Sequence, residues 1–187
     1  MPTLTEQIAH ASSLAVAPAW PLAALAYSLR GVPGDIVECG AYRGGSTIAL
    51  AAATPSKAVY SFDTFGGMPT PGPHDEHEEG DFLTTFEEVV LNTAPYPNIF
   101  LVRGRFADTV PNFEARAISL LYLDCDLYDS YRLCLTHFWP MVSPGGLVVL
   151  EDYKAIDCPG ARKACDEFFP AGDMRLFFDF VTVRKQA

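Results

Sequence analysis

Basic residues are scarce in this sequence. The 187-residue chain has 13 Lys and Arg against 23 Asp and Glu, a formal net charge of −10, and a pI of about 4.7. Nucleic acids and anionic membranes are bound mainly through Lys and Arg. We therefore expect neither of them to be the main partner of this protein. Small charged ligands, which respond to local fields, remain compatible with this composition.

The chain also lacks the patterns of export and of a disulfide framework. Its five cysteines are an odd number without a CxxC pair, which indicates reduced thiols rather than disulfides or a zinc ribbon. No Lys or Arg precedes the apolar N-terminal stretch, and Pro18 and Pro21 interrupt it, unlike a secretory signal. No run is long and apolar enough to span a bilayer. We expect a cytoplasmic protein in which residues 1–33 form a helical lead-in.

From Gly34 onward the sequence alternates between short apolar runs and helical patterns. Such strands, apolar on both faces and separated by helices, form mostly parallel sheets with helices on both sides. We predict a single α/β domain over residues 34–187. The expected strands cover 35–40, 58–63, 99–104, 118–124, 146–152 and 177–185. The expected helices cover 12–16 with 20–30, then 46–54, 82–92, 130–142 and 161–169.

Residues 69–81, PTPGPHDEHEEGD, break this alternation. Proline, glycine and charged residues dominate the segment, so it packs poorly as a strand or a helix. Long loops in compact domains are usually functional or disordered. A solvated acidic connector and a mobile lid over the site are equally compatible with it. His74 and His77 lie in this loop, and exposed loop histidines usually have no catalytic or substrate-facing role.

A glycine-containing turn, ECGAYRGGS (38–46), follows the first expected strand. Ligands of doubly wound sheets bind beyond the carboxyl ends of the strands, where glycine allows a close backbone approach. The spacing is not GxGxxG, and Glu38 disfavours a phosphate but suits a cationic ligand such as S-adenosylmethionine. Asp63 ends the second expected strand, where an acidic side chain binds a ribose diol. A helix cap or a turn carboxylate would explain either acid alone, but together they favour an adenosine-type ligand.

Acidic residues also end two later strands. Asp124 ends the fourth expected strand, and Glu151 and Asp152 end the fifth. If these strands are neighbours, the three carboxylates converge and raise one another's pKa values at a cost in stability. A divalent cation removes this conflict, and an all-oxygen ligand set indicates magnesium, with manganese or calcium as alternatives. Asp126 lies just beyond the strand end, where it can face a substrate.

Two other interpretations of these acids compete with a metal site. Acidic residues often cap the helices that follow them, but Asp129 and Ser130 offer a better start for the helix expected at 130–142. Lys154 is the main rival, because its ammonium group would neutralise part of the charge without a metal.

With these motifs in this order, the sequence resembles the macrocin-type sugar O-methyltransferases, a class I S-adenosylmethionine-dependent family that includes mycinamicin- and novobiocin-type enzymes. The resemblance runs from about Gly34 to Lys185. The stretches that carry it are GDIVECGAYRGGS (34–46), VYSFDTFGGMPTP (59–71), RGRFADTVP (103–111), LYLDCDLYDSY (121–131), MVSPGGLVVLEDY (141–153) and CPGARKACDEF (158–168).

The resemblance implies a Rossmann-like class I methyltransferase fold and a magnesium-dependent methyl transfer from S-adenosylmethionine to a sugar hydroxyl. A second, vicinal hydroxyl could chelate the same ion. By the same resemblance, Asp124, Glu151 and Asp152 would hold the metal, and Asp126 would be the general base. The cofactor would be held by Glu38, Gly40 and Asp63, with Tyr42, Ser46 and Arg105 as further residues lining its pocket.

The sequence departs from the family pattern in three respects. Glu151 stands where relatives usually have aspartate, and Cys125 replaces a usual glycine. The chain is also short at the N-terminus, where relatives carry helices used in dimerisation and substrate binding. The acceptor and the oligomeric state, a homodimer included, therefore stay open. Two rival functions remain, namely methylation of a catechol or other phenolic acceptor and catalytically silent binding of S-adenosylmethionine.

Overall fold

The computed structural model describes residues 3–11, 16–114 and 117–186. Within these ranges the strands form one sheet in the order β3-β2-β1-β4-β5-β7-β6. The first five strands of this order are parallel, β7 pairs antiparallel with β5, and β6 pairs antiparallel with β7 at the edge. The strands are β1 (Asp35–Cys39), β2 (Val59–Asp63), β3 (Ile99–Arg103), β4 (Ile118–Leu123), β5 (Val142–Leu150), β6 (Met174–Phe177) and β7 (Phe180–Arg184).

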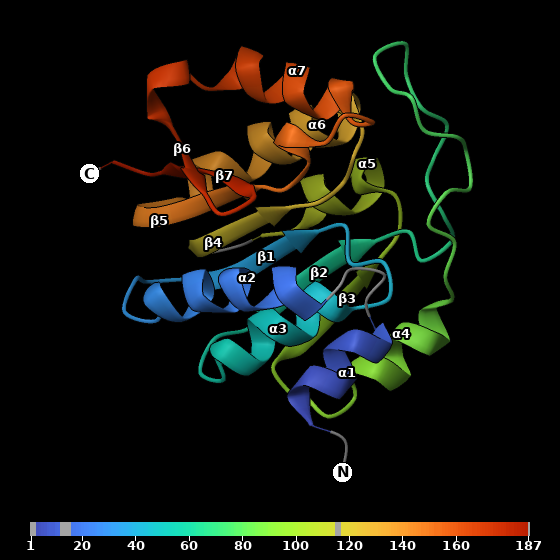
Figure 1. Cartoon of the computed structure of the whole chain (residues 1–187), viewed down its shortest axis with the longest axis vertical. Coiled ribbons are helices and arrows are strands. Elements are labelled where there is room, and N and C mark those ends of the chain that lie inside the picture. Colours follow the sequence, from blue (N-terminus) through green and yellow to red (C-terminus); the bar gives the residue numbers. More distant parts are fainter. Residues whose placement is uncertain (1–2, 12–15, 115–116, 187) are drawn as a thin grey trace.

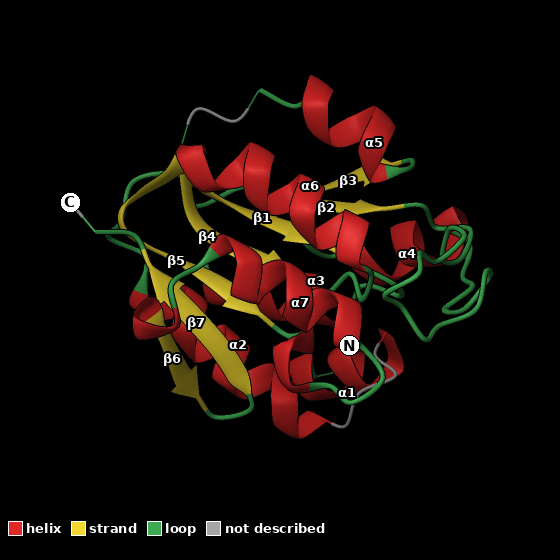
Figure 2. Ribbon diagram, turned by 90° about the horizontal axis from the view of Figure 1, so that it is seen from above, coloured by secondary structure: helices red, strands yellow, loops and turns green. Residues whose placement is uncertain are grey.

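Helices cover both faces of this sheet. Figures 1 and 2 show α5, α6 and α7 on one face, whereas α2 and α3 lie on the other. The helices are α1 (Leu4–Ala11), α2 (Val16–Ser28), α3 (Gly45–Ala53), α4 (Phe86–Thr93), α5 (Phe106–Thr109), α6 (Tyr128–Phe138) and α7 (Pro159–Phe168). The predicted α/β architecture, with a mostly parallel sheet between two helical layers, is therefore confirmed.

Alternate residues of the central strands pack into the two helical layers. In β1, Ile36 shares a buried cluster with Leu22 of α2, whereas Val37 belongs to the cluster that contains Leu135 of α6. Because both faces of the strand are buried, its sequence is a continuous apolar run rather than an alternating one. Because helices cover both faces, a ligand can reach the sheet only at the ends of its strands.

Two expectations about the C-terminal half need correction. Residues 142–145, which precede the fifth strand expected at 146–152, lie within β5, whose register against β4 is interrupted between Ile118 and Leu120. Gly145 has φ +83°, and the residues of β5 between Val142 and Leu147 form a bulge, so the strand continues through them. The single late strand expected at 177–185 is a hairpin, because β6 and β7 pair antiparallel across a tight turn.

The expected helix starts are also different in detail. The residue before α3 is Gly44 in a left-handed conformation, and no side chain caps the helix. Ser46 and Thr47 donate to a buried carboxylate instead. Helix α6 begins at Tyr128, ahead of the expected Asp129 and Ser130. Its N-cap residue Leu127 makes no side-chain cap, but Oδ1 of Asp75 accepts from the backbone N–H of Tyr128 at 2.9 Å.

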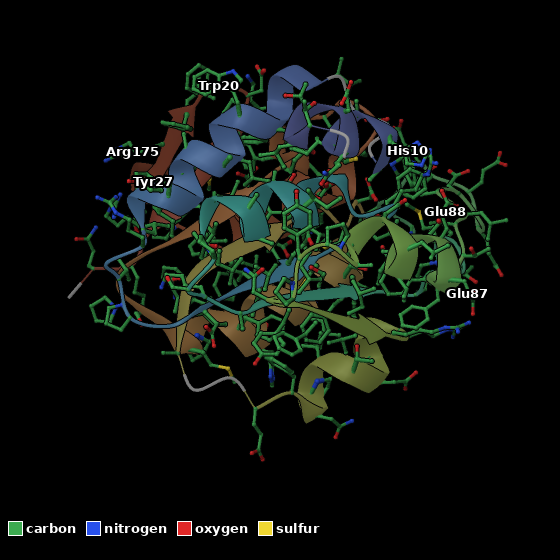
Figure 3. The ribbon with its side chains drawn as sticks, turned by 90° about the horizontal axis from the view of Figure 1, so that it is seen from below. His10, Trp20, Tyr27, Glu87, Glu88 and Arg175 are labelled. Carbon is green, nitrogen blue, oxygen red and sulfur yellow. The ribbon has the colours of Figure 1, made fainter. Side chains whose placement is uncertain are left out.

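The N-terminal residues contribute two helices. Most of the helix expected at 12–16 lies outside the described residues, but α1 and α2 fall within the predicted lead-in 1–33. Helix α2 packs against α3, and its outer face carries Trp20 and Tyr27, which are 57% and 55% exposed (Figure 3). None of the described helices has both the length and the apolar character needed to cross a bilayer.

Candidate active site

A cavity of about 510 Å³ lies beyond the carboxyl ends of the parallel strands. Its volume is within the range of about 300–1,000 Å³ that is typical of small-molecule sites. In Figure 1 the green loop after β2 runs along this end of the sheet. The predicted site residues that line the cavity are Gly40, Tyr42, Ser46, Asp63, Arg105, Asp124, Asp126, Glu151 and Asp152.

The turn after β1 requires glycine at position 40. Gly40 has φ +95°, and a Cβ atom there would lie 1.6 Å from the carbonyl oxygen of Asp124. The backbone N–H of Asp124 in turn donates to the carbonyl of Cys39 at 3.0 Å. The ends of β1 and β4 are therefore in direct backbone contact, which brings the glycine turn next to the first acidic residue of the site.

Asp63 braces the same turn from the end of β2. Its Oδ2 accepts hydrogen bonds from the backbone N–H groups of Ala41 (3.0 Å) and Tyr42 (2.8 Å), and its Oδ1 accepts one from Phe65 (2.8 Å). These bonds stabilise Tyr42 and Phe65, which both have positive φ. Asp63 thus acts as a turn carboxylate, and its side chain also reaches the cavity wall.

Glu38 does not reach the cavity. Its side chain is fully buried, and its two oxygens accept hydrogen bonds of 2.5 Å from the hydroxyl groups of Ser46, Thr47 and Ser61. Burial raises the pKa of Glu38, and these hydrogen bonds oppose that shift. The direct contact with a cationic ligand that the sequence suggests is not supported by this placement. Instead, Glu38 holds Ser46, which does line the cavity.

The three predicted metal ligands meet at the tips of β4 and β5. Leu123 and Leu150 are paired at the last rungs of these strands, so the acids that follow lie side by side. One carboxylate oxygen each from Asp124, Glu151 and Asp152 lies within 4.8 Å of the other two. The longer side chain of Glu151 does not keep it out of this group. An all-oxygen set of this size suits a hard divalent cation such as magnesium.

Hydrogen bonds orient Asp152 within this acidic group. Asp152 is 2% exposed, and its Oδ2 accepts from the backbone N–H of Cys125 (3.0 Å) and from the hydroxyl of Tyr131 (2.8 Å). Asp152 also contributes one carboxylate oxygen to the acidic group. The side chain of Asp124 accepts a longer bond of 3.2 Å from the hydroxyl of Tyr122.

Burial and mutual repulsion raise the pKa values of the three carboxyl groups. Burial, followed by the neighbouring Asp152 and Glu151, raises the pKa of Asp124 well above its usual range. Burial and Asp152 raise the pKa of Glu151 to about 8. Burial also raises the pKa of Asp152, although its hydrogen bonds oppose the shift. Without a cation these carboxylates therefore destabilise one another in their charged form.

The two other interpretations of the acids find no support in the described residues. Lys154 is exposed and forms no ion pair there with the acidic group. Glu151 precedes a short 3-10 helix (Asp152–Lys154) but makes no side-chain capping bond to it.

Asp126 faces the cavity from an unusual backbone conformation. Its φ is +58°, a region that Asp and Asn tolerate better than most residues. Its backbone N–H donates to Oδ2 of Asp152 at 2.9 Å, which holds the residue beside the acidic group. Burial, and next the charge of Asp152, raise its pKa to about 8. Asp126 is thus a half-buried residue in the cavity wall.

Two residues that the sequence did not single out for the site lie against Asp126. Cys158 Sγ lies 3.6 Å from its Oδ1, and His77 Nε2 lies 3.7 Å from the same oxygen. The loop sequence favours an exposed His77 without a catalytic or substrate-facing role, but its side chain is only 11% exposed. Residues separated by as many as 81 positions meet here, and local sequence patterns carry no signal for such a contact.

Comparison with known proteins identifies relatives that match most of the chain. The family model "Macrocin-O-methyltransferase (TylF)" matches residues 23–175. The chain is 34% identical over 149 residues to the 8-demethyl-8-(2,3-dimethoxy-alpha-L-rhamnosyl)-tetracenomycin-C 4'-O-methyltransferase of Streptomyces olivaceus, covering 70% of this chain and 57% of the relative. It is 33% identical over 155 residues to the demethyldecarbamoylnovobiocin O-methyltransferase of Streptomyces niveus, covering 73% and 58%.

A third relative and two solved structures extend the comparison. The mycinamicin III 3''-O-methyltransferase of Micromonospora griseorubida is 30% identical over 158 residues, covering 74% of this chain and 61% of the relative. The chain therefore spans about three fifths of the length of these curated relatives. The O-methyltransferase NovP superposes with a TM-score of 0.80 at 27% identity, covering 95% of this chain and 83% of NovP. The calicheamicin methyltransferase CalS11 gives 0.78 at 22% identity, covering 93% and 80%. The predicted Rossmann-like methyltransferase fold is confirmed.

Proposed function

The chain belongs to the macrocin-O-methyltransferase (TylF) family, and from this we propose that it transfers a methyl group from S-adenosylmethionine to a hydroxyl group of a sugar or a glycosylated natural product. The observation that carries the proposal is the shared cavity. Asp126, the acidic group and the glycine turn all line it. A methyl donor and a hydroxyl acceptor bound there would lie close enough for an in-line transfer.

The cofactor would lie along the turns after β1 and β2. Gly40 lies in the wall of the cavity, and Tyr42, Ser46, Asp63 and Arg105 contribute to the same wall. Glu38 would act through Ser46, whose hydroxyl it holds by a 2.5 Å hydrogen bond. When bound, S-adenosylmethionine supplies an electrophilic methyl group, so the chain's task is to position that group and to exclude water.

The acceptor hydroxyl would lie at the acidic group. Asp124, Glu151 and Asp152 are the residues that would hold Mg²⁺, and their oxygen ligand set supports this assignment. The ion would lower the pKa of a coordinated hydroxyl and hold its oxygen in place. An acceptor with two vicinal hydroxyl groups could use both of them as ligands, which would select the methylated position.

Asp126 would accept the hydroxyl proton at Oδ1 as the methyl group is transferred. The carboxylate is adjacent to the acidic group and is part of the cavity wall. General base catalysis of this kind typically contributes about 10²–10⁴-fold to the rate. The loop 69–81 would act as a lid, because Pro69, His77 and Asp81 also line the cavity.

A screen with methyl-labelled S-adenosylmethionine tests this function. The acceptors should include deoxysugar natural products, polysaccharide fragments and catechols, each with and without Mg²⁺. We expect label on a sugar hydroxyl. Label on catechols alone would replace the sugar acceptor with a phenolic one. Cofactor binding without transfer to any acceptor would favour a silent binding protein.

A further inference from the structure

Three side chains from separate segments meet beside the proposed lid. His77 belongs to the loop 69–81, Asp126 follows β4, and Cys158 directly precedes α7. Their ligand atoms form a compact triangle, with Nε2 to Sγ 3.4 Å, Nε2 to Oδ1 3.7 Å and Sγ to Oδ1 3.6 Å. We propose that these three residues form a binding site for a transition-metal cation, with Zn²⁺ as the preferred ion, separate from the all-oxygen group.

The triangle has the dimensions of a tetrahedral zinc site. Zinc lies about 2.3 Å from a cysteine sulfur, about 2.0–2.1 Å from a histidine nitrogen and about 2.0–2.2 Å from a carboxylate oxygen. These bond lengths and tetrahedral angles separate neighbouring ligand atoms by about 3.3–3.6 Å. The three observed separations differ from this range by at most a few tenths of an ångström, so side-chain adjustments alone would admit the ion.

The chemistry of the ligands separates this site from its neighbour. Imidazole and thiolate select zinc and similar ions over magnesium, whereas the carboxylates of Asp124, Glu151 and Asp152 suit magnesium. No CxxC pair is needed, because the ligands come from three distant parts of the chain.

The surroundings of the site are also those of a metal centre. Oδ2 of Asp81 lies 3.5 Å from Nδ1 of His77, on the side of the ring away from Nε2. A carboxylate in this position commonly orients a metal-bound histidine. Cys158 is 4% exposed, and the side chains of His77 and Asp126 are 11% and 18% exposed. All three ligands line the cavity, so a fourth coordination position would be open to it.

Zinc at this position would have two consequences. The Cys158 thiol would become a thiolate, with its proton released to the solvent. The loop 69–81 would be fastened to the start of α7 through His77. On the proposed function, Asp126 would also be occupied as a ligand and unavailable as a base, so Zn²⁺ would inhibit methyl transfer that Mg²⁺ supports.

Cobalt titration of the full chain tests the site directly. Co²⁺ is added to the protein in excess Mg²⁺, and absorption is recorded before and after addition of Zn²⁺. We expect a thiolate-to-cobalt charge-transfer band together with tetrahedral ligand-field bands, all removed by one equivalent of Zn²⁺. The absence of a charge-transfer band would overturn the proposal and leave only a hydrogen-bonded thiol. This readout needs no acceptor, so it stays informative even if methyl transfer is never detected.

Matched variants locate the ion. Cys158→Ala and His77→Gln should each lose the charge-transfer band, and Asp81→Asn should weaken Zn²⁺ binding by about 10–100-fold. The controls His74→Gln and Cys165→Ala should keep the band, because neither side chain belongs to the triangle. Glu151→Gln should also keep it. A band that survives both Cys158→Ala and His77→Gln would contradict this location.

Discussion

The backbone N–H of Asp126 donates a 2.9 Å hydrogen bond to Oδ2 of Asp152. This bond joins the proposed base, just beyond β4, to a proposed metal ligand at the end of β5. The same oxygen accepts from Cys125 N–H and from the hydroxyl of Tyr131 on α6. The positive φ of Asp126 is thus stabilised by the carboxylate of a proposed metal ligand. The geometry of the base and that of the acidic group therefore depend on each other.

Tyr131→Phe tests this dependence. The change removes the hydroxyl that donates to Asp152 at 2.8 Å but keeps the buried ring. We expect Mg²⁺ affinity, measured by calorimetry, to fall by about 10–100-fold. The same hydroxyl also donates to the carbonyl of Leu123 (2.9 Å) and accepts from the backbone N–H of Asp152 (3.3 Å). The free energy of unfolding should therefore fall by more than about 0.5–1.5 kcal/mol, which is what one hydrogen bond typically contributes. The control is Tyr153→Phe, whose hydroxyl donates to Asp166 instead. Equal losses of affinity in the two variants would contradict the role of Tyr131.

Asp126→Asn tests the proposed base. Asparagine keeps the backbone N–H and tolerates the left-handed conformation, so the fold should persist. We expect S-adenosylmethionine binding to be unchanged and turnover to fall by about 10²–10⁴-fold. Turnover is measured with labelled cofactor on an accepted substrate, and the exposed Asp173→Asn serves as the control. Unchanged turnover in Asp126→Asn would exclude Asp126 as the base.

Removal of the metal tests the acidic group. Treatment with EDTA should abolish methyl transfer, and added Mg²⁺ should restore it. Asp152→Ala should abolish transfer in a way that Mg²⁺ does not restore, because the variant loses a ligand and the acceptor for the backbone of Asp126. Both effects are measured with labelled cofactor. Full activity after exhaustive chelation would remove the metal from the mechanism.

Gly40→Ala tests the contact between the ends of β1 and β4. The new Cβ would collide with the backbone carbonyl of Asp124. A backbone atom cannot move aside as the end of a flexible side chain can. We expect the free energy of unfolding to fall by more than about 1–3 kcal/mol, which is the usual cost of one strained backbone conformation. Urea denaturation measures it. At Gly172 a Cβ would meet nothing within 4 Å, so Gly172→Ala should be nearly neutral. Similar losses for both variants would refute the collision.

Hydrogen exchange tests the lid. If the loop 69–81 closes over bound ligands, the amides of residues 72–80 should exchange more slowly in the presence of S-adenosylmethionine. The loop already contacts the cavity through His77 and Asp81, so closure would add protection rather than create structure. The described amides of α7 serve as an internal reference. Equal exchange in the free and cofactor-bound protein would contradict a lid.

Local patterns were sufficient for most of the fold. The apolar runs bounded by glycine and acidic residues predicted the five parallel strands to within a residue or two, except for the earlier start of β5 at Val142. The convergence of Asp124 with Glu151 and Asp152 followed from one further rule, that neighbouring parallel strands end at the same edge of a sheet. The prediction of a single strand at 177–185 was wrong, because the chain forms the β6–β7 hairpin there. Phe178 adopts a positive φ in its turn, which its residue type does not suggest.

Strand periodicity and turn composition are local properties, so the sequence by itself determined where the strands end and which acids follow them. Only the tertiary structure decided which way those side chains face and what they meet. The Glu38 carboxylate accepts hydrogen bonds from three hydroxyl groups and does not face the cavity. His77 reaches Cys158 across 81 positions. Contacts of this kind depend on how a loop folds back onto the sheet, and that is decided by the packing of the whole chain.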